Sequence, residues 1–171
     1  MKSLFLLVLC LFMRADIVAQ EGHCPKLPVQ YAWETGADYE KDRDLVKKTL
    51  RWLCQTPLAV DVQQRSLANA FVLEWLTGVP SVTIEIKTEN LPFYKSNPDL
   101  LFTFIHGMAL YKMDHEDEKN EVTLYCKGFE TVSSLALQSK ELSKEHDLKP
   151  LLKATRKQKL REYVKELLQK K

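Results

Sequence analysis

The sequence predicts an all-α protein made of a single compact domain, and three observations lead to this prediction. Apolar residues recur with a period of about 3.6 residues over most of the chain, as they do along one face of a helix. Glycine is rare, at 5 of 171 residues, whereas an all-β chain needs many turns. With 45% apolar and 28% charged residues, the chain has the composition of a folded domain with one core. We therefore expect about five helices in an irregular bundle.

The first twenty residues, MKSLFLLVLCLFMRADIVAQ, have the features of a signal peptide. Lys2 gives a positive start, an apolar run spans residues 4–13, and a cleavage point lies near Ala19 and Gln20. This run reaches only about 15 Å as a helix, half of a bilayer core, so it is too short for a membrane span. We predict a signal peptide over residues 1–20 and a protein exported to the periplasm or secreted. A buried N-terminal helix is the alternative.

The cysteine count fits a protein that does not depend on disulfides. Without residues 1–20, three cysteines remain, Cys24, Cys54 and Cys126, and an odd number this small does not build a disulfide scaffold. We expect the two helical cysteines, Cys54 and Cys126, to be inert buried thiols. One bridge with a leftover thiol stays open as the alternative.

Residues 21–37 form a lead-in segment with two prolines, two glycines and no helical period. The predicted helical domain follows, over residues 38–171. Its first helix runs from Asp38 to about Gln55 and ends at Thr56, because a residue that precedes a proline is disfavoured in a helix.

The later helices carry their own start and stop signals. The second begins after Asp61, a good N-cap residue, and runs to about Thr77, where we expect Gly78 to end it in a left-handed conformation, with Pro80 two residues later. The third begins with Asn97 as its cap and Pro98 at the first position, where the missing N–H costs nothing. The last three predicted helices cover about residues 98–113, 119–142 and 150–169.

One stretch has the pattern of a strand. Residues 81–87, SVTIEIK, alternate polar and apolar side chains with a period of two. A single strand is not stable by itself. We expect this segment either to pair with residues 29–33, which also alternate, or to lie in a groove between helices.

His106 and Gly107 stand side by side within the most apolar helix. Apolar residues cover more than half of its circumference, and a narrow polar stripe holds Asp99, Thr103 and His106. We expect His106 on this polar stripe and not on the apolar face. Glycine costs about 1 kcal/mol in a helix interior, so Gly107 predicts close approach of a second helix or of residues 81–87. The alternative is that Asp99, Thr103 and His106 bind a small molecule or a metal ion.

Other catalytic and metal-binding patterns are missing from the sequence. It contains no GxSxG, HExxH or P-loop motif, and its four histidines lack the spacing of zinc ligands. The acidic stretch MDHEDE, residues 113–118, lacks the alternation and the turn glycine of a calcium loop. We therefore predict that the protein is not an enzyme and has no metal site or cofactor.

The C-terminal helix is strongly basic. Residues 149–171 hold nine Lys and Arg against two Glu, a local charge of +7 (nine minus two) in a chain of net +2. Such a helix either complements its own dipole near its C-terminal end or contacts an anionic surface. The overall charge is too small to predict nucleic-acid binding. The predicted basic surface consists of Lys153, Arg156, Lys157, Lys159 and Arg161.

The stretches RWLCQTP, AFVLEWLTGVPSVTIEI and NPDLLFTFIHGMALYKM carry a resemblance to a known group. Over about residues 45–165 the chain resembles an uncharacterised family of small exported all-helical proteins from Gram-negative bacteria. That group has no established activity, so the resemblance implies no functional residues. Residues 98–138 also look like a tetratricopeptide unit (TPR-like), although Tyr111 follows Gly107 by four positions and no second copy occurs.

Together these features predict an exported helical protein that acts as a protein–protein interaction or binding module in the cell envelope. We expect its partner to be another protein or an envelope component. Small-molecule or metal binding at the helix stripe, and electrostatic attachment through the basic helix, are the alternatives.

Overall fold

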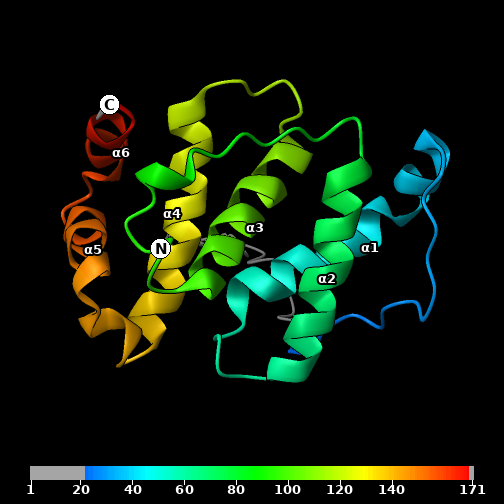
Figure 1. Ribbon diagram of the computed structural model, residues 1–171, viewed down its shortest axis with the longest axis horizontal. Helices are drawn as coiled ribbons and strands as arrows, with labels where there is room; N and C mark the ends of the chain where they lie inside the picture. Colours follow the sequence, from blue (N-terminus) through cyan, green and yellow to red (C-terminus); the bar gives the residue numbers. More distant parts are fainter. Residues whose placement is uncertain (1–21, 170–171) are drawn as a thin grey trace, which may run out of the picture.

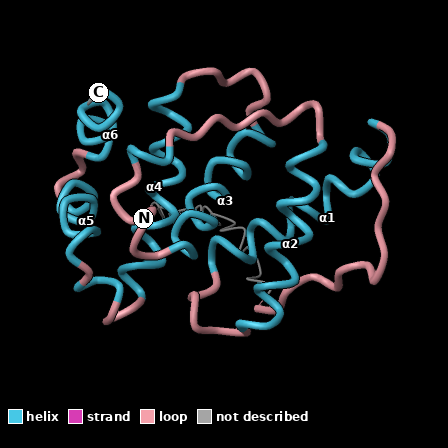
Figure 2. The backbone as a smooth tube through the Cα atoms, viewed as in Figure 1, coloured by secondary structure: helices cyan, strands magenta, loops and turns pink. Residues whose placement is uncertain are grey.

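The computed structural model describes residues 22–169, and this part of the chain contains six α-helices and no strand (Figures 1 and 2). The prediction of an all-α, single-domain fold is confirmed. The predicted signal peptide lies outside the described residues. Within residues 22–169 no helix is long and apolar enough to cross a membrane. The helices are α1 (Gly36–Gln55), α2 (Val62–Gly78), α3 (Pro98–Asp114), α4 (Glu121–Gln138), α5 (Lys149–Arg156) and α6 (Leu160–Gln169).

Most helix ends lie where the sequence signals place them. At the start of α1, the backbone N–H and the hydroxyl of Thr35 both donate to the carboxylate of Asp38 at 2.8 Å. The helix ends before Thr56. Asp61 precedes α2, although its side chain makes no capping bond and its φ of 48° is left-handed. At the start of α4, the Asn120 side chain accepts a hydrogen bond from the backbone N–H of Thr123 at 3.0 Å.

The predicted helix over residues 150–169 is two helices, which raises the number from about five to six. The chain turns at Gln158, whose φ of 57° lies in the left-handed region. The N–H of Lys159 donates to the carbonyl of Ala154 at 2.9 Å, which closes α5 before α6 begins. The pattern concealed this break because apolar residues recur on both sides of it.

Helices α3 and α4 form a hairpin at the centre of the molecule, with α1 and α2 on one side and α5 and α6 on the other (Figure 1). Two apolar clusters follow from this arrangement. One surrounds the α3–α4 hairpin and takes in Phe104 and Phe129, whose rings meet edge to face at 4.9 Å. The other lies among α1, α2 and the C-terminal half of α3, with Trp75 and Phe71 at its centre.

Gly107 lies at a close approach of α3 and α4. A Cβ atom there would lie 2.7 Å from the carbonyl oxygen of Lys127 and would collide with the side chain of Thr131. The expectation that a neighbouring helix crosses near Gly107 is confirmed, and that helix is α4.

Residues 82–87 run as a loop without helix or ladder in the described chain, and Lys87 has extended dihedral angles, whereas Ser81 still belongs to a turn (Figure 2). Val82 is buried, Ile84 and Ile86 are partly buried, and the intervening side chains are exposed. The segment lies across helices α2, α3 and α4, so the groove alternative is correct and pairing with residues 29–33 is not (Figure 1). The lead-in instead packs its aromatic rings against α2.

Candidate functional site

His106 is buried, which corrects the expectation that it lies on an outward polar stripe. Only 1% of the residue is exposed, and neither ring nitrogen has a hydrogen-bond partner in the described chain. The helical wheel misplaced it because α3 is covered by neighbouring elements on several sides. Thr103 is also buried, and its hydroxyl donates to the backbone carbonyl of Asp99 at 3.0 Å. Asp99 itself is exposed.

The buried side of this stripe faces Arg65 of α2. Burial, and secondarily the charge of Arg65, lowers the pKa of His106 from 6.5 to about 3, so the imidazole is neutral at ordinary pH. Arg65 is also largely buried and donates to the carbonyls of Leu53 and Thr56, the former at 3.2 Å. Its guanidinium lies 5.5 Å from the ring centre of Trp52. We call these groups, His106, Thr103 and Arg65 with Trp52, the polar seam.

No cavity described in residues 22–169 is lined by Asp99, Thr103 or His106. The surface carboxylate of Asp99 and the buried imidazole of His106 therefore share none of these four cavities. Ligand binding by this stripe stays a prediction.

The three cysteines of the described chain are free thiols. Burial raises the pKa of Cys54 to about 12 and also raises the pKa of Cys126 above its ordinary value. Both thiols are therefore protonated and poorly nucleophilic at neutral pH.

The acidic loop after α3 is held in place by basic residues. Asp114 pairs with Lys47 and Glu116 pairs with Arg43, both from α1. The buried Lys112 donates to the backbone carbonyls of Glu116 and Glu118, the second at 2.6 Å. Over residues 22–169, no three His, Cys, Asp or Glu side chains stand together in a way that could hold a metal ion.

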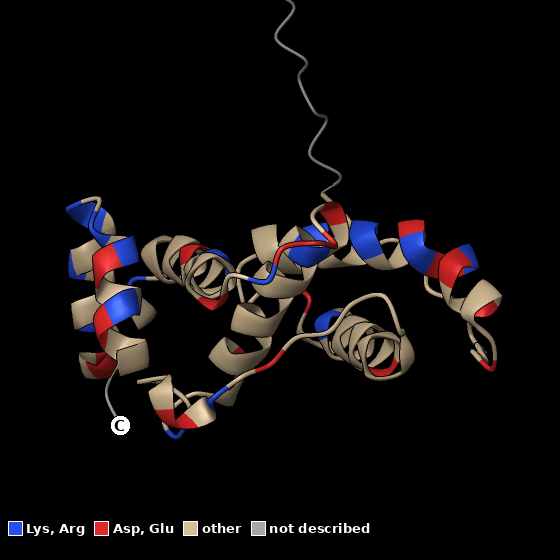
Figure 3. Ribbon diagram, turned by 90° about the horizontal axis from the view of Figure 1, so that it is seen from above, with Lys and Arg blue, Asp and Glu red and all other residues tan. Residues whose placement is uncertain are grey.

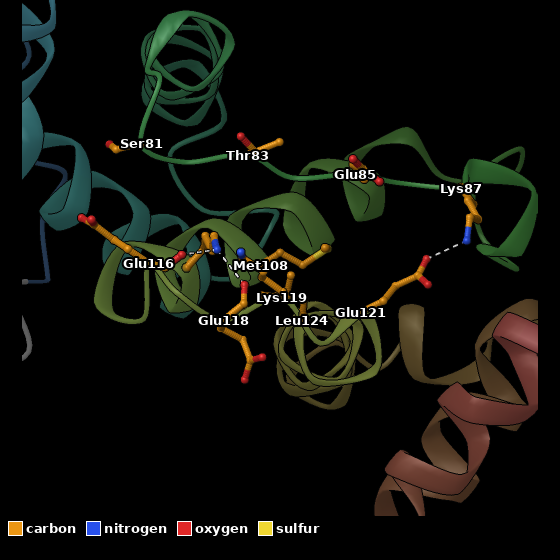
Figure 4. Close-up of a pocket in the computed structure, with 11 residues that line it drawn as sticks. Ser81, Thr83, Glu85, Lys87, Met108, Glu116, Glu118, Lys119, Glu121 and Leu124 are labelled. Carbon is orange, nitrogen blue, oxygen red and sulfur yellow. Dashed lines mark hydrogen bonds and ion pairs between the residues drawn. The ribbon is translucent and has the colours of Figure 1, made fainter.

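A cavity of about 500 Å³ lies between residues 81–87 and the segment that joins α3 to α4 (Figure 4). Met108 and Leu124 form its apolar floor. At one end, Lys87 reaches across to Glu121 with an N–O distance of 2.9 Å. We call this cavity, with the extended segment as one wall, the groove.

Arg43 of α1 links Ser81 and Glu116, two of the residues that line the groove. Its guanidinium donates to the hydroxyl of Ser81 at 3.2 Å and to the carbonyl of Met113 at 3.1 Å. Since the same side chain pairs with Glu116, one arginine joins the extended segment, the end of α3 and the acidic loop. Sequence reasoning missed Arg43 and Lys112 because they look like ordinary charges on helix surfaces.

The extended wall of the groove has free backbone groups. In the described chain, no backbone N–H or C=O of residues 82–86 takes part in a hydrogen bond. The N–H of Lys87 donates to the hydroxyl of Tyr125 on α4 at 2.8 Å. In an extended chain, alternate residues direct their backbone groups to the same edge, so we expect Thr83 and Glu85 to direct theirs, as Lys87 does, to the edge that faces α4. This is the edge beside the groove.

The five residues of the predicted basic surface are exposed on α5, α6 and the turn between them (Figure 3). In residues 22–169 none of them takes part in an ion pair. They are Lys153, Arg156, Lys157, Lys159 and Arg161.

No protein-family model, no curated protein and no solved structure matches this chain. The resemblance to exported proteins of Gram-negative bacteria therefore stays a prediction, and functional proposals depend on the geometry of the groove and of the basic surface.

Proposed function

We propose that the protein is a peptide-binding module in which an extended segment of another protein lies in the groove beside residues 81–87. The observation that carries this proposal is the row of backbone groups without hydrogen bonds along residues 82–86, a non-helical segment of the described chain whose side chains alternate between buried or partly buried and exposed. Backbone groups of this kind accept an added strand, and the main-chain hydrogen bonds supply affinity that does not depend on the partner's side chains.

The groove adds selectivity to this backbone pairing. Its floor of Met108 and Leu124 favours an apolar side chain on the bound segment, since burying that side chain removes apolar surface from water. Its rim carries both signs of charge, including Glu85 and Lys119. A peptide with one central apolar residue flanked by polar residues suits this lining.

Polar contacts between its walls hold the groove in a preformed shape without a ligand. Arg43 and the Lys87–Glu121 pair join its two walls, and Lys112 fixes the acidic loop from below. A preformed site loses little conformational entropy on binding, which favours affinity.

The test uses a matched pair of substitutions at an exposed position. Glu85→Pro removes an N–H from the groove edge, whereas Glu85→Ala removes the same carboxylate and keeps the N–H. Short peptides are selected from a random display library against the wild-type chain, and their affinities for the three proteins are measured by fluorescence anisotropy. We expect Glu85→Pro to weaken binding at least about tenfold, the equivalent of one to two lost hydrogen bonds, and Glu85→Ala to change it far less.

Hydrogen exchange gives a second measurement on the same complexes. The amides of residues 82–86 should exchange rapidly in the free protein and become protected when peptide is bound. Selected peptides that bind Glu85→Pro as tightly as wild type, or that leave these amides unprotected, would refute strand addition. Circular dichroism and thermal unfolding confirm that both variants are folded.

A further inference from the structure

The turn between α5 and α6 concentrates positive charge at one end of the molecule (Figures 1 and 3). Residues 149–169 hold seven Lys and Arg and two Glu, a local charge of +5 (seven minus two). All seven basic side chains are exposed. In the described chain no ion pair neutralises any of them.

The helix dipole does not account for this charge once the break at Gln158 is known. Lys153 and Arg156 lie in the last turn of α5, where cations complement the dipole. Lys159 and Arg161 instead stand at the start of α6, where the dipole is positive and cations are unfavourable. The fold therefore brings cations from both helices, together with the positive end of α6, to one corner. We call residues 153–161 the basic corner.

The apolar faces of these two helices are already occupied. Leu151 and Leu152 of α5 and Val164 of α6 are buried in the cluster around the α3–α4 hairpin, and both helices pack on α4. The pair therefore cannot turn an apolar face into a lipid bilayer without leaving the core. Any contact through the basic corner is made by charge alone.

We propose that the basic corner attaches the protein to the surface of an anionic lipid bilayer, without insertion. Four features favour this partner. The corner lies at an end of the molecule, so a flat surface can approach it (Figure 3). Lysine, a point charge suited to mobile headgroups, supplies three of its five cations. No large apolar or aromatic side chain in residues 153–161 is exposed to stack on bases, as a nucleic-acid surface requires. The local charge far exceeds the charge of the whole chain.

The size of the effect follows from the number of cations near the surface. Each Lys or Arg close to an anionic bilayer strengthens binding about fivefold at moderate salt. Loss of two such charges should therefore weaken the partition coefficient on the order of 25-fold, and reversal of their sign should weaken it further.

The experiment compares two double variants with the same change in net charge. Lys157→Glu with Lys159→Glu reverses charge at the basic corner. Lys48→Glu with Arg51→Glu reverses the same amount of charge on α1. Both of these side chains are exposed and take part in no ion pair in the described chain. Helix α1 does not pack closely against α5 or α6. All proteins are used as the whole chain, so any contribution from residues 1–21 is the same in each.

Binding is measured by co-sedimentation with phosphatidylglycerol–phosphatidylcholine vesicles and with phosphatidylcholine vesicles. We expect wild type and the α1 variant to bind the anionic vesicles, and the corner variant to lose at least about 25-fold of that affinity. Raising the salt from about 0.01 M to about 0.15 M should weaken binding strongly, because the screening length falls from about 30 Å to about 8 Å.

Three results would overturn the proposal. Equal losses in the two double variants would show that net charge, and not the corner, controls binding. Equal binding of wild type to both kinds of vesicle would show that headgroup charge is irrelevant. Tighter, corner-dependent binding to double-stranded DNA or to an acidic peptide than to vesicles would identify a different partner. The Glu85→Pro variant should bind vesicles as wild type does, so failure here is distinct from failure of peptide binding.

Discussion

Acid should destabilise this protein through His106. The imidazole is buried and neutral and has no hydrogen-bond partner among residues 22–169, and burial lowers its pKa from 6.5 to about 3. Above pH 6.5 the folded and unfolded states both hold a neutral ring, so the group has no pH-dependent effect. Below pH 6.5 the imidazole of His106 is protonated in the unfolded chain but stays neutral in the folded chain. The free energy of unfolding therefore falls as the pH is lowered, until the pH nears 3.

The size of this effect follows from the two pKa values. Over the whole window from 6.5 to about 3 the loss of unfolding free energy approaches about 5 kcal/mol. Between pH ~7.5 and pH ~5 it is about 2 kcal/mol, a large fraction of the stability of a typical domain. Because the residue is almost fully buried, solvent screening does not reduce this figure appreciably.

The assay is urea unfolding at those two pH values for wild type, His106→Leu and His146→Gln. His106→Leu removes the titrating ring and leaves no unpaired polar atom, so we expect it to lose about 2 kcal/mol less than wild type on acidification. His146→Gln is the matched control, because it removes a histidine from an exposed position. Contributions from carboxylates are common to all three proteins and cancel. If His106→Leu loses as much stability as wild type, the imidazole is not the neutral, desolvated group that the structure contains.

Three further predictions concern packing and thiol chemistry. Gly107→Ala should lower the unfolding free energy by about 1–3 kcal/mol, because α4 occupies the space of a Cβ, whereas Gly36→Ala, with open space around it, should be nearly neutral. Lys112→Met should lower the free energy of unfolding, measured with denaturant, by about 1.5–3 kcal/mol, because the buried ammonium group that donates to the loop carbonyls is lost. The control Lys119→Met, at an exposed position, should change the unfolding free energy little. Cys54 is only partly exposed and should be alkylated by iodoacetamide much more slowly in the folded than in the urea-unfolded protein, as mass spectrometry of the modified peptide would show, because burial of the thiol raises its pKa to about 12.

The fold class could be predicted because local signals and global packing agree in most of the chain. The Thr56–Pro57 pair placed the end of α1, and the Asn97–Pro98 pair placed the start of α3. The prediction that Gly78 is a left-handed terminator was wrong. Gly78 is the last helical residue of α2, no described glycine has a positive φ, and a Cβ atom there would collide with Tyr39. Gly107 was correctly interpreted as a helix crossing, since a glycine in the middle of a helix needs a compensating contact.

The break at Gln158 could not be predicted from pattern alone. A left-handed residue usually shows itself as Gly or Asn, and glutamine gives no such signal. Only the packing of α5 and α6 side by side on α4 selects the turn. Predicting one helix over residues 150–169 also affected the functional interpretation, because it gave no reason to expect Lys159 and Arg161 at the start of a separate helix.

The site residues show the same limit. Asp99, Thr103 and His106 share one side of α3 as expected, but a helical wheel does not reveal which sides of a helix are covered. The groove was hidden for a different reason. Its walls come from segments that are distant in sequence, and its floor residues, Met108 and Leu124, look like ordinary core positions.

The polar seam also determines how acid should unfold the molecule. It lies where the cluster of α1 and α2 meets the cluster around the α3–α4 hairpin, and α3 contributes to both, with Phe104 in one and Met113 in the other. The two clusters therefore cannot separate while α3 keeps its packing, and protonation at the seam should unfold them together.

Tryptophan fluorescence and circular dichroism can test this cooperativity. All three tryptophans, Trp33, Trp52 and Trp75, belong to the α1–α2 cluster, so their fluorescence reports on that side alone. Circular dichroism at far-ultraviolet wavelengths reports on every helix. We expect the two acid transitions to coincide, as in two-state unfolding. A fluorescence change at distinctly higher pH than the loss of helix would mean that α1 and α2 detach first, and that α3 does not bind the two halves into one cooperative unit.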